Sequence, residues 1–299
     1  MADRIELRHL RIVSVAAALL TMLATSAMVA SFASSVLAVD GRTDLLQVDA
    51  KNFSRPTIID NKYMPLKPGL QKVYEGWTIN DEGVKIPHKV ISIATDLVKD
   101  INGIETVVMW DRDIVDGKLE ESELYFRAQD DEGNVWHFGE VKEVYDEDIK
   151  IVGAKVWMDG RLGARSGIIM EAKPAVGTPS LSQGYAPGVY RWDDRGQVRK
   201  VGKTVTVPAG TFKDVIVIEE WSAPELKMGA LQLKYYAPDI GYVQVGFEGD
   251  DPVKEYLVLT KVSMLNAREM DEVRAEALLV EERSYFYGQT TQPPQRRQE

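Results

Sequence analysis

The chain has 299 residues, of which 36 are Lys or Arg and 46 are Asp or Glu, giving a formal net charge of −10, and it contains no cysteine. An acidic chain repels phosphate backbones and anionic lipids, so nucleic-acid binding and electrostatic attachment to a membrane surface are excluded from the expected functions. Without cysteine the chain has no disulfide framework, no thiol catalysis and no cysteine-based zinc site.

The N-terminal segment has the pattern of a secretory signal. Three arginines among the first eleven residues precede an uncharged, largely apolar run at 12–38, which ends in small residues of the kind a signal peptidase reads. We therefore predict a signal peptide over 1–38 and an extracytoplasmic protein that is secreted, periplasmic or on the cell surface. The alternative is an uncleaved anchor, because 27 uncharged residues are long enough to cross a bilayer. Contact with a membrane is expected only through this segment, if it is uncleaved.

Most of the remaining chain has the pattern of antiparallel strands. After an extended lead-in over 39–62, short alternating or apolar runs are separated by turn residues. Asn102-Gly103 and Asp116-Gly117 are typical of tight hairpin turns. The predicted strands span 71–79, 84–94, 104–112, 119–130, 135–144, 149–158, 197–207, 213–221, 231–237, 241–247 and 254–265.

The middle of the chain, 163–193, interrupts this pattern. It contains Pro174, Pro179 and Pro187, and its alternation is weak, so we interpret it as loops around the sheet. With no helical segment between the other strands, parallel βαβ units are disfavoured. The sequence therefore predicts a mainly β domain over 63–265, built as a curved antiparallel sheet that forms a half-barrel or an open barrel.

One α-helix is predicted at the C-terminus, over 266–287, packed across the sheet. Asn266 followed by Glu269 resembles a capping box, and Val273, Ala277 and Val280 recur at helical spacing. Residues 288–299 are polar and contain two adjacent prolines, which predicts a disordered tail.

The sequence contains no assembled catalytic set, so no catalytic residue, metal ligand or cofactor is predicted. His88 and His137 are the histidines outside the N-terminal segment, too few for a three-histidine metal site, and a lone strand histidine usually serves packing. A catalytic triad through either one is weakened further, because no Gly-x-Ser-x-Gly elbow accompanies them.

Carboxylates nevertheless cluster on two predicted strands. Asp111 and Asp113 share one face of their strand, and Glu121 and Glu123 share one face of the next. Such pairs are compatible with glycoside hydrolysis or with a weak calcium site. We favour solvated strand positions, because turns and solvent-facing strand positions attract acids and the calcium-loop spacing is absent.

Large aromatic side chains recur along the predicted strands. Their usual role is burial in a sheet core, but on a curved sheet they can also line a concave face that holds an apolar ligand. The candidate lining residues are Trp77, Trp110, Trp136, Trp157, Trp221, Tyr125 and Tyr235.

Three stretches carry a resemblance to known proteins: Asp-Asn-Lys-Tyr-Met-Pro-Leu-Lys-Pro-Gly at 60–69, Gly-Asn-Val-Trp-His-Phe-Gly-Glu at 133–140 and Val-Pro-Ala-Gly-Thr-Phe-Lys-Asp at 207–214. With them, the chain between 60 and 265 resembles a family of exported, β-rich prokaryotic proteins of unknown function. More distantly it is similar to the curved-sheet lipid and lipoprotein carriers of the Lol type. The resemblance implies an extracytoplasmic β fold and supplies no catalytic residues.

Together these observations favour an exported, non-enzymatic protein that binds an apolar small molecule or an envelope protein in the concave face of its sheet. Two alternatives from other classes stay open. One is a carboxylate-dependent hydrolase, either carbohydrate-active or metal-assisted, and the other is a structural component of the cell envelope.

Overall fold

The computed structural model describes residues 45–187, 192–222, 229–251, 254–288 and 295–296. The predicted signal segment and most of the predicted tail lie outside the described residues. The described chain begins with a lead-in that contains one short 3-10 helix, η1 (Ala50–Asn52), capped by the side chain of Asp49. Phe53 then packs edge-on against Trp136 and Phe138, with ring centroids 6.0 and 5.7 Å apart, and this contact attaches the lead-in to the sheet.

Antiparallel strands make up most of the described chain, and all the pairings between them are antiparallel. In chain order they are β1 (Leu70–Ile79), β2 (Lys85–Ile101), β3 (Ile104–Val115), β4 (Lys118–Gln129), β5 (Val135–Tyr145), β6 (Ile151–Met158), β7 (Arg165–Met170), β8 (Leu181–Ala186), β9 (Trp192–Val207), β10 (Gly210–Ser222), β11 (Leu231–Ala237), β12 (Gly241–Glu248), β13 (Tyr256–Met264) and β14 (Gln295–Arg296).

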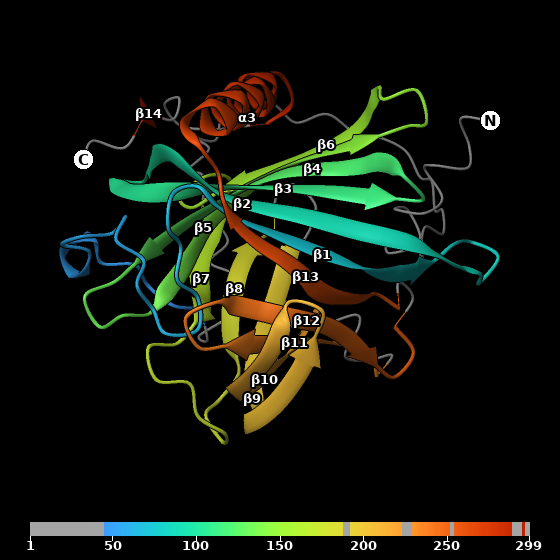
Figure 1. The fold of residues 1–299 in the computed structure, drawn as a ribbon. Coiled ribbons are helices and arrows are strands. Elements are labelled where there is room, and N and C mark those ends of the chain that lie inside the picture. The colour runs from blue at the N-terminus through green and yellow to red at the C-terminus, as the bar shows by residue number, and fades with distance from the viewer. Residues whose placement is uncertain (1–44, 188–191, 223–228, 252–253, 289–294, 297–299) are drawn as a thin grey trace, which may run out of the picture. The chain divides into compact units, whose positions relative to one another are not determined.

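The sheet closes on itself (Figure 1). Its order is β1-β13-β12-β11-β10-β9-β8-β7-β5-β4-β3-β2, and β1 also pairs with β2, so these twelve strands form a ring. β6 pairs with β5, and β14 pairs with β2, outside the ring. The mainly β prediction is confirmed, but the predicted half-barrel or open barrel is wrong. The fold is a closed antiparallel β-barrel with one C-terminal helix.

Closure depends on two short strands in the segment whose sequence predicts loops. β7 pairs with β5 and β8, and β8 pairs with β9, so the two strands join the groups on either side of them. Most of their residues are buried regardless of the face they point to, so the apolar and polar alternation of a half-exposed strand is missing. Gly167 permits their close approach, because a Cβ there would lie 2.1 Å from the carbonyl oxygen of Ser182.

Two hairpin turns follow directly from the sequence. Asn102 and Gly103 have φ angles of 55° and 83°, and Asp116 and Gly117 have φ angles of 49° and 78°. A two-residue turn of type I′ requires positive φ at both central positions, which Asn-Gly and Asp-Gly tolerate best. These turns set the first pairs of each hairpin, and irregularities between Ala94 and Val98 of β2 and between Asp113 and Ile114 of β3 shift the registers farther along.

The predicted C-terminal helix is present as α3 (Ala267–Tyr287) and lies over the strand group that includes β2, β4 and β6 (Figure 1). The side chain of Asn266 accepts hydrogen bonds from the backbone N–H groups of Arg268 and Glu269, and the Glu269 carboxylate accepts one from the Asn266 N–H at 2.8 Å. This reciprocal pair is the capping box that the sequence predicts. None of the described helices combines the length and the apolar character that crossing a membrane requires.

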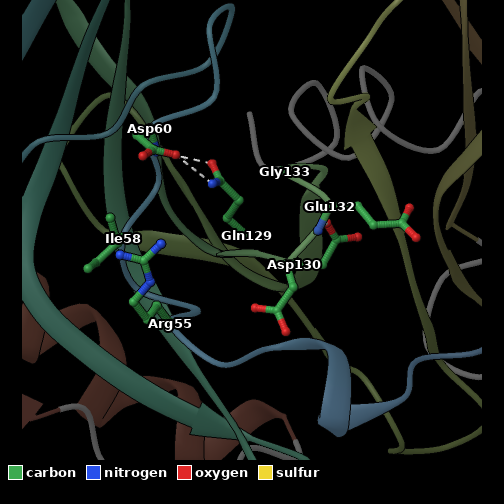
Figure 2. A pocket seen from close by; sticks show the side chains of 8 residues that line it. Arg55, Ile58, Asp60, Gln129, Asp130, Glu132 and Gly133 are labelled. Atoms are coloured by element: carbon green, nitrogen blue, oxygen red, sulfur yellow. Dashed lines mark hydrogen bonds between the residues drawn. The ribbon is translucent and has the colours of Figure 1, made fainter.

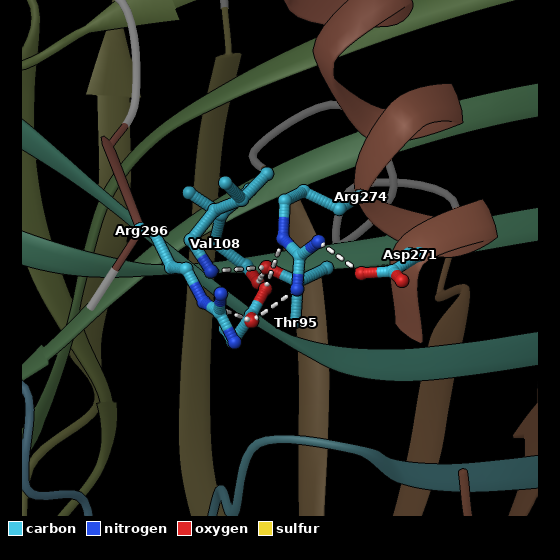
Figure 3. Close-up of polar contacts among 7 residues, drawn as sticks. Thr95, Val108, Asp271, Arg274 and Arg296 are labelled. Atoms are coloured by element: carbon cyan, nitrogen blue, oxygen red, sulfur yellow. Dashed lines mark hydrogen bonds and ion pairs between the residues drawn. The ribbon is translucent and has the colours of Figure 1, made fainter. Parts of the chain in front are cut away.

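Ion pairs fix α3 to the sheet. Arg274 binds both carboxylate oxygens of Asp96 on β2, at 3.1 and 2.7 Å, and also pairs with Asp271 at 2.6 Å (Figure 3). Arg296 of β14 approaches the same Asp96 at 3.4 Å (Figure 3). A bidentate arginine–carboxylate contact is directional, so it sets the position of the helix along β2.

Two further ion pairs join the helix to the sheet. Lys99 Nζ and Glu281 Oε1 are 2.5 Å apart, and the two residues are 0% and 1% exposed. Arg283 binds both oxygens of Glu143 at 2.6 and 2.7 Å. These contacts place charged groups within an otherwise apolar helix–sheet interface.

The strands beneath α3 carry a core on each face. The outer core contains Leu124 and Phe126 of β4 together with Val273 and Ala277 of α3. The inner core joins β3 to β10 and β11 across the ring, through Val107, Met109, Ile216 and Tyr236. Because side chains alternate along a strand, residues 121, 123, 125 and 127 of β4 face the barrel interior.

Candidate functional site

The interior face of β3 and β4 is lined by acids. The register places Asp111 directly opposite Glu123, and Asp113 directly opposite Glu121. The sequence predicts that each pair shares a face of its own strand, and the structure brings all four carboxylates together inside the barrel. Like charges directly opposite each other on neighbouring strands are destabilising unless a cation or a proton compensates them.

β5 supplies one such cation and one more acid. Lys142 lies opposite Glu123 and binds its carboxylate at 2.9 Å, and it forms a second, shorter ion pair with Glu121. Burial disfavours the ammonium, but these carboxylates outweigh burial and raise the pKa of Lys142 well above its usual value. We use the name carboxylate wall for Asp111, Asp113, Glu121, Glu123 and Glu140.

Glu140 is the most completely buried member of the carboxylate wall, at 1% exposure. It lies opposite Tyr125, whose hydroxyl donates a hydrogen bond to Glu123. Burial, and then the charge of Glu123, raise the pKa of Glu140 to about 8. Glu140 Oε2 is buried and has no hydrogen-bond partner among the described residues.

Asp111 lies on the interior face of β3, near Lys72 of β1 and Ser92 of β2. Its pKa is raised to about 7, mainly by burial and also by the charge of Glu123. A hydrogen bond from Ser92 acts in the opposite direction. Lys72 is the nearby cation, but its own pKa is lowered to about 8 by burial, and its ammonium donates to the carbonyl of Ile240 at 3.0 Å. Asp111 Oδ1 is a second buried oxygen without a hydrogen-bond partner among the described residues.

Beside the carboxylate wall, an imidazole lies between two acids. His88 on β2 is 5% exposed; its Nε2 forms a short hydrogen bond with Asp113, and its Nδ1 is 3.4 Å from Glu255 Oε1. Burial opposes protonation of His88, but Asp113 and then Glu255 outweigh it and raise its pKa. Burial raises the pKa of Asp113 to about 6 and that of Glu255 to about 7. Gln232 donates to the other oxygen of Glu255 at 2.9 Å.

The second histidine of the sequence analysis, His137, has different surroundings. Its ring packs edge-on against Trp157 at 4.8 Å and against Tyr125 at 5.9 Å, and its Nε2 lies 2.8 Å from the carbonyl oxygen of Gly139. Burial, with the nearby charge of Arg127, lowers the pKa of His137 well below its usual value. At neutral pH His137 is therefore an uncharged packing residue.

The aromatic candidates are not gathered at one place. Trp110 and Trp136 lie in the outer core beneath α3, and their indole N–H groups donate to Ser122 and Asp130 at 2.9 and 2.8 Å. Tyr125 faces the interior beside the carboxylate wall.

The remaining aromatic candidates lie elsewhere on the barrel. Trp157 is buried against Ala164 and Ala186. Trp77 packs on Phe247 and Tyr256. Trp221 and Tyr235 are partly buried on β10 and β11. A ligand role for the seven candidates stays a prediction.

A polar depression of about 260 Å³ lies at the turn between β4 and β5 (Figure 2). There the Gln129 side chain donates to Asp60 at 2.7 Å and accepts from the backbone N–H groups of Asp60 and Asn61. Asp130 accepts four hydrogen bonds from the turn and from Trp136. The side chains that line the depression therefore hold the lead-in and the turn together. The depression is lined by Arg55, Ile58, Asp60, Gln129, Asp130, Asp131, Glu132 and Gly133.

The grouping of His88 with Asp113 and Glu255 has no sequence signal. His88 and Asp113 lie on adjacent strands, whereas Glu255 immediately precedes β13, on the other side of β1 in the ring. No fixed spacing links three such positions. The pairing of β1 with β2 on one side and with β13 on the other brings Glu255 to the histidine.

No family model matches this sequence, and no curated protein sequence matches it. Among solved structures, the chain is similar to a "putative exported protein with YmcC-like fold" from Bacteroides fragilis, with a TM-score of 0.41 and 18% identity. It is also similar to a "putative lipoprotein" from Parabacteroides distasonis, with a TM-score of 0.39 and 15% identity. Each comparison covers 68% of this chain and 99% of the other. These similarities assign no function, and the predicted likeness to Lol-type carriers is not shown by them.

Proposed function

We propose that this protein is an exported, non-enzymatic binding protein that takes up a small cation at the carboxylate wall inside its barrel. The observation that carries the proposal is that two buried carboxylate oxygens of the wall have no hydrogen-bond partner among the described residues. Other charges that act on the wall come from Lys72, Arg127, Lys142 and Lys155, and from His88 beside Asp113. The proposed export is supported by the signal pattern over 1–38.

Two buried oxygens of the carboxylate wall support the proposal that a cation binds there. Asp111 Oδ1 and Glu140 Oε2 have no hydrogen-bond partner among the described residues. A buried polar group without a partner costs about 1–3 kcal/mol, and more when it is charged. With pKa values of about 7 and 8, these two carboxyl groups retain protons near neutral pH. A cation bound at either carboxyl group would displace its proton and supply its missing partner.

The same interior argues against the predicted apolar ligand. An apolar molecule placed against the carboxylate wall would remove water from charged groups without replacing its hydrogen bonds, which is unfavourable. Trp110 and Trp136, expected to line a concave face, are packed in the outer core of the sheet and do not face the interior. The carboxylates attract a cation, whereas they do not attract an apolar ligand.

The test is cation binding to the purified, chelator-treated protein. Thermal unfolding and calorimetric titration are run with Mg²⁺, Ca²⁺, Mn²⁺, Zn²⁺ and spermidine, each in two buffers of different ionisation enthalpy. We expect at least one cation to raise Tm and to release protons. Glu140→Gln should reduce the proton release, whereas Glu105→Gln, at an exposed position on β3, should not. If no cation in the panel changes Tm or gives heat of binding, the proposed function is wrong.

A further inference from the structure

An imidazole and two carboxylates from separate parts of the barrel converge at one place beside the carboxylate wall. His88, Asp113 and Glu255 each offer a donor atom, and the three atoms lie within 4.8 Å of one another. His88 Nδ1 and Glu255 Oε1 are 3.4 Å apart. Two ligands of one tetrahedral ion, with bonds near 2.1 Å, are separated by about 3.4 Å. The histidine and Glu255 therefore already have the spacing of neighbouring ligands.

The orientation of the imidazole leaves one nitrogen for a ligand. Ionised Asp113 can only accept, so His88 Nε2 donates to it, and in the neutral ring the lone pair is on Nδ1. Although burial opposes it, Asp113 and Glu255 raise the pKa of His88, so a metal at Nδ1 would displace a proton there. Nδ1 is buried, makes no hydrogen bond to any described residue, and points toward Glu255. A carboxylate that holds the far nitrogen of a metal-binding histidine is the usual way such a ring is oriented.

The donor set distinguishes between classes of cation. Calcium takes six to eight oxygen ligands and magnesium keeps most of its waters, whereas imidazole nitrogen suits zinc and related transition metals. The side chains of Asp113 and Glu255 are 25% and 17% exposed, which leaves room for water to complete the coordination. Gln232 holds the second oxygen of Glu255, so that carboxylate is positioned as well.

We propose that His88 Nδ1 and the Glu255 carboxylate bind a divalent transition metal of the zinc class, with Asp113 holding the imidazole in the metal-binding tautomer. The assignment rests on the proposed function, since it places a cation inside the barrel, but its two ligands lie beside the carboxylate wall and only Asp113 belongs to the wall. It differs from that function in requiring one specific histidine. The carboxylate wall alone would serve any small cation.

The experiment uses the chelator-treated protein titrated with Zn²⁺ and Co²⁺ against a competing chelator. We expect one metal per chain in the wild type. His88→Gln and Glu255→Gln should each weaken zinc binding at least 100-fold, and Asp113→Asn should weaken it about 10–100-fold, as for residues that orient a ligand. Glu105→Gln is the matched control and should bind as the wild type does. Circular dichroism and Tm verify that each variant is folded.

A measurement on the wild type keeps the test independent of the variants. X-ray absorption of the zinc-loaded protein should show one imidazole among nitrogen and oxygen ligands, and outside the N-terminal segment only His137 could replace His88. Binding of Mg²⁺ or Ca²⁺ without Zn²⁺ or Co²⁺ would overturn the metal class. Unchanged zinc affinity in folded His88→Gln and Glu255→Gln, or a zinc spectrum without imidazole, would overturn the ligand assignment while the proposed function stands. Absence of all cation binding would overturn both.

Discussion

Replacing Glu140 with Gln should stabilise the protein above neutral pH. Glu140 is 1% exposed, and burial raises its pKa from the ordinary 4.5 to about 8. The folded protein therefore binds a proton at this site more tightly than the unfolded chain does. Stability from this group is fully present below pH 4.5 and is lost as the pH rises from 4.5 to 8. Gln has nearly the shape of the protonated acid and cannot ionise.

The magnitude follows from the two pKa values. At about 1.4 kcal/mol for each pH unit, the interval between 4.5 and about 8 corresponds to roughly 5 kcal/mol, of which roughly 3 kcal/mol is lost by pH 7. Lys142 loses one attractive neighbour in the variant but keeps Glu121 and Glu123. We therefore expect Glu140→Gln to lie within about 1 kcal/mol of the wild type at pH 5 and to exceed it by roughly 3 kcal/mol at pH 7.

The assay is urea unfolding at pH 5, 6, 7 and 8, followed by tryptophan fluorescence, with Glu105→Gln as the control at an exposed position of the same sheet. Asp111, Asp113 and Glu255 also have raised pKa values, so both proteins should lose stability with rising pH. Only the difference between them reports on Glu140. A constant difference across the four pH values, or a variant less stable than the wild type at pH 8, would refute the buried-carboxylate argument.

Three further changes test the framework around the wall. Lys99→Met leaves Glu281 buried without its partner and should lower the free energy of unfolding by about 3–5 kcal/mol. The double variant Lys99→Met with Glu281→Leu should recover most of that loss, as measured by urea unfolding in a double-mutant cycle. Gly76→Ala would place a Cβ 1.8 Å from a carbonyl oxygen of β13 and should destabilise by about 3 kcal/mol or more, while Gly246→Ala, with open space, should change Tm little. Asn266→Ala removes the capping box and should cost about 1 kcal/mol by urea unfolding, and an unchanged midpoint would show that the helix end needs no cap.

Local chemistry in the sequence predicts local structure well. Asn102-Gly103 and Asp116-Gly117 form the expected turns, because few other residue pairs accept positive φ at both positions. Asn266 caps α3, because its side chain and that of Glu269 satisfy backbone N–H groups that would otherwise lack partners. Each of these features depends on residues only a few positions apart.

Closure of the barrel is not predictable in the same way. β7 and β8 are six residues each and are buried on both faces for most of their length, so they lack the alternation that identifies a half-exposed strand. The prolines beside β8 strengthen the interpretation of 163–193 as loops. Without these two strands the sheet ends at β6, which pairs with β5, and at β9, which gives the open barrel that the sequence predicts.

The sequence also does not show which face of each strand points into the barrel. Alternation places Asp111 and Asp113 on one face of β3, and Glu121 and Glu123 on one face of β4, but it does not show whether that face is enclosed. An acidic face usually meets water, which favours solvated carboxylates. Here α3 covers the apolar face from outside, through Val273 and Ala277, so the acidic face turns into the barrel.

This inversion is the reason to assign the interior acids a role in binding. The helix gives the apolar faces of β2 to β5 a core of their own, so the barrel does not need those acids for stability. Buried ion pairs can often be replaced by apolar residues without loss of stability, and a buried carboxylate oxygen without a hydrogen-bond partner is costlier still. The cost falls when a cation enters, because attraction between charges is stronger in a low-dielectric interior than in water. Without a bound cation, the protein is therefore least stable at alkaline pH, where these carboxyl groups are charged. The stabilisation by a cation should increase as Asp111 and Glu140 ionise.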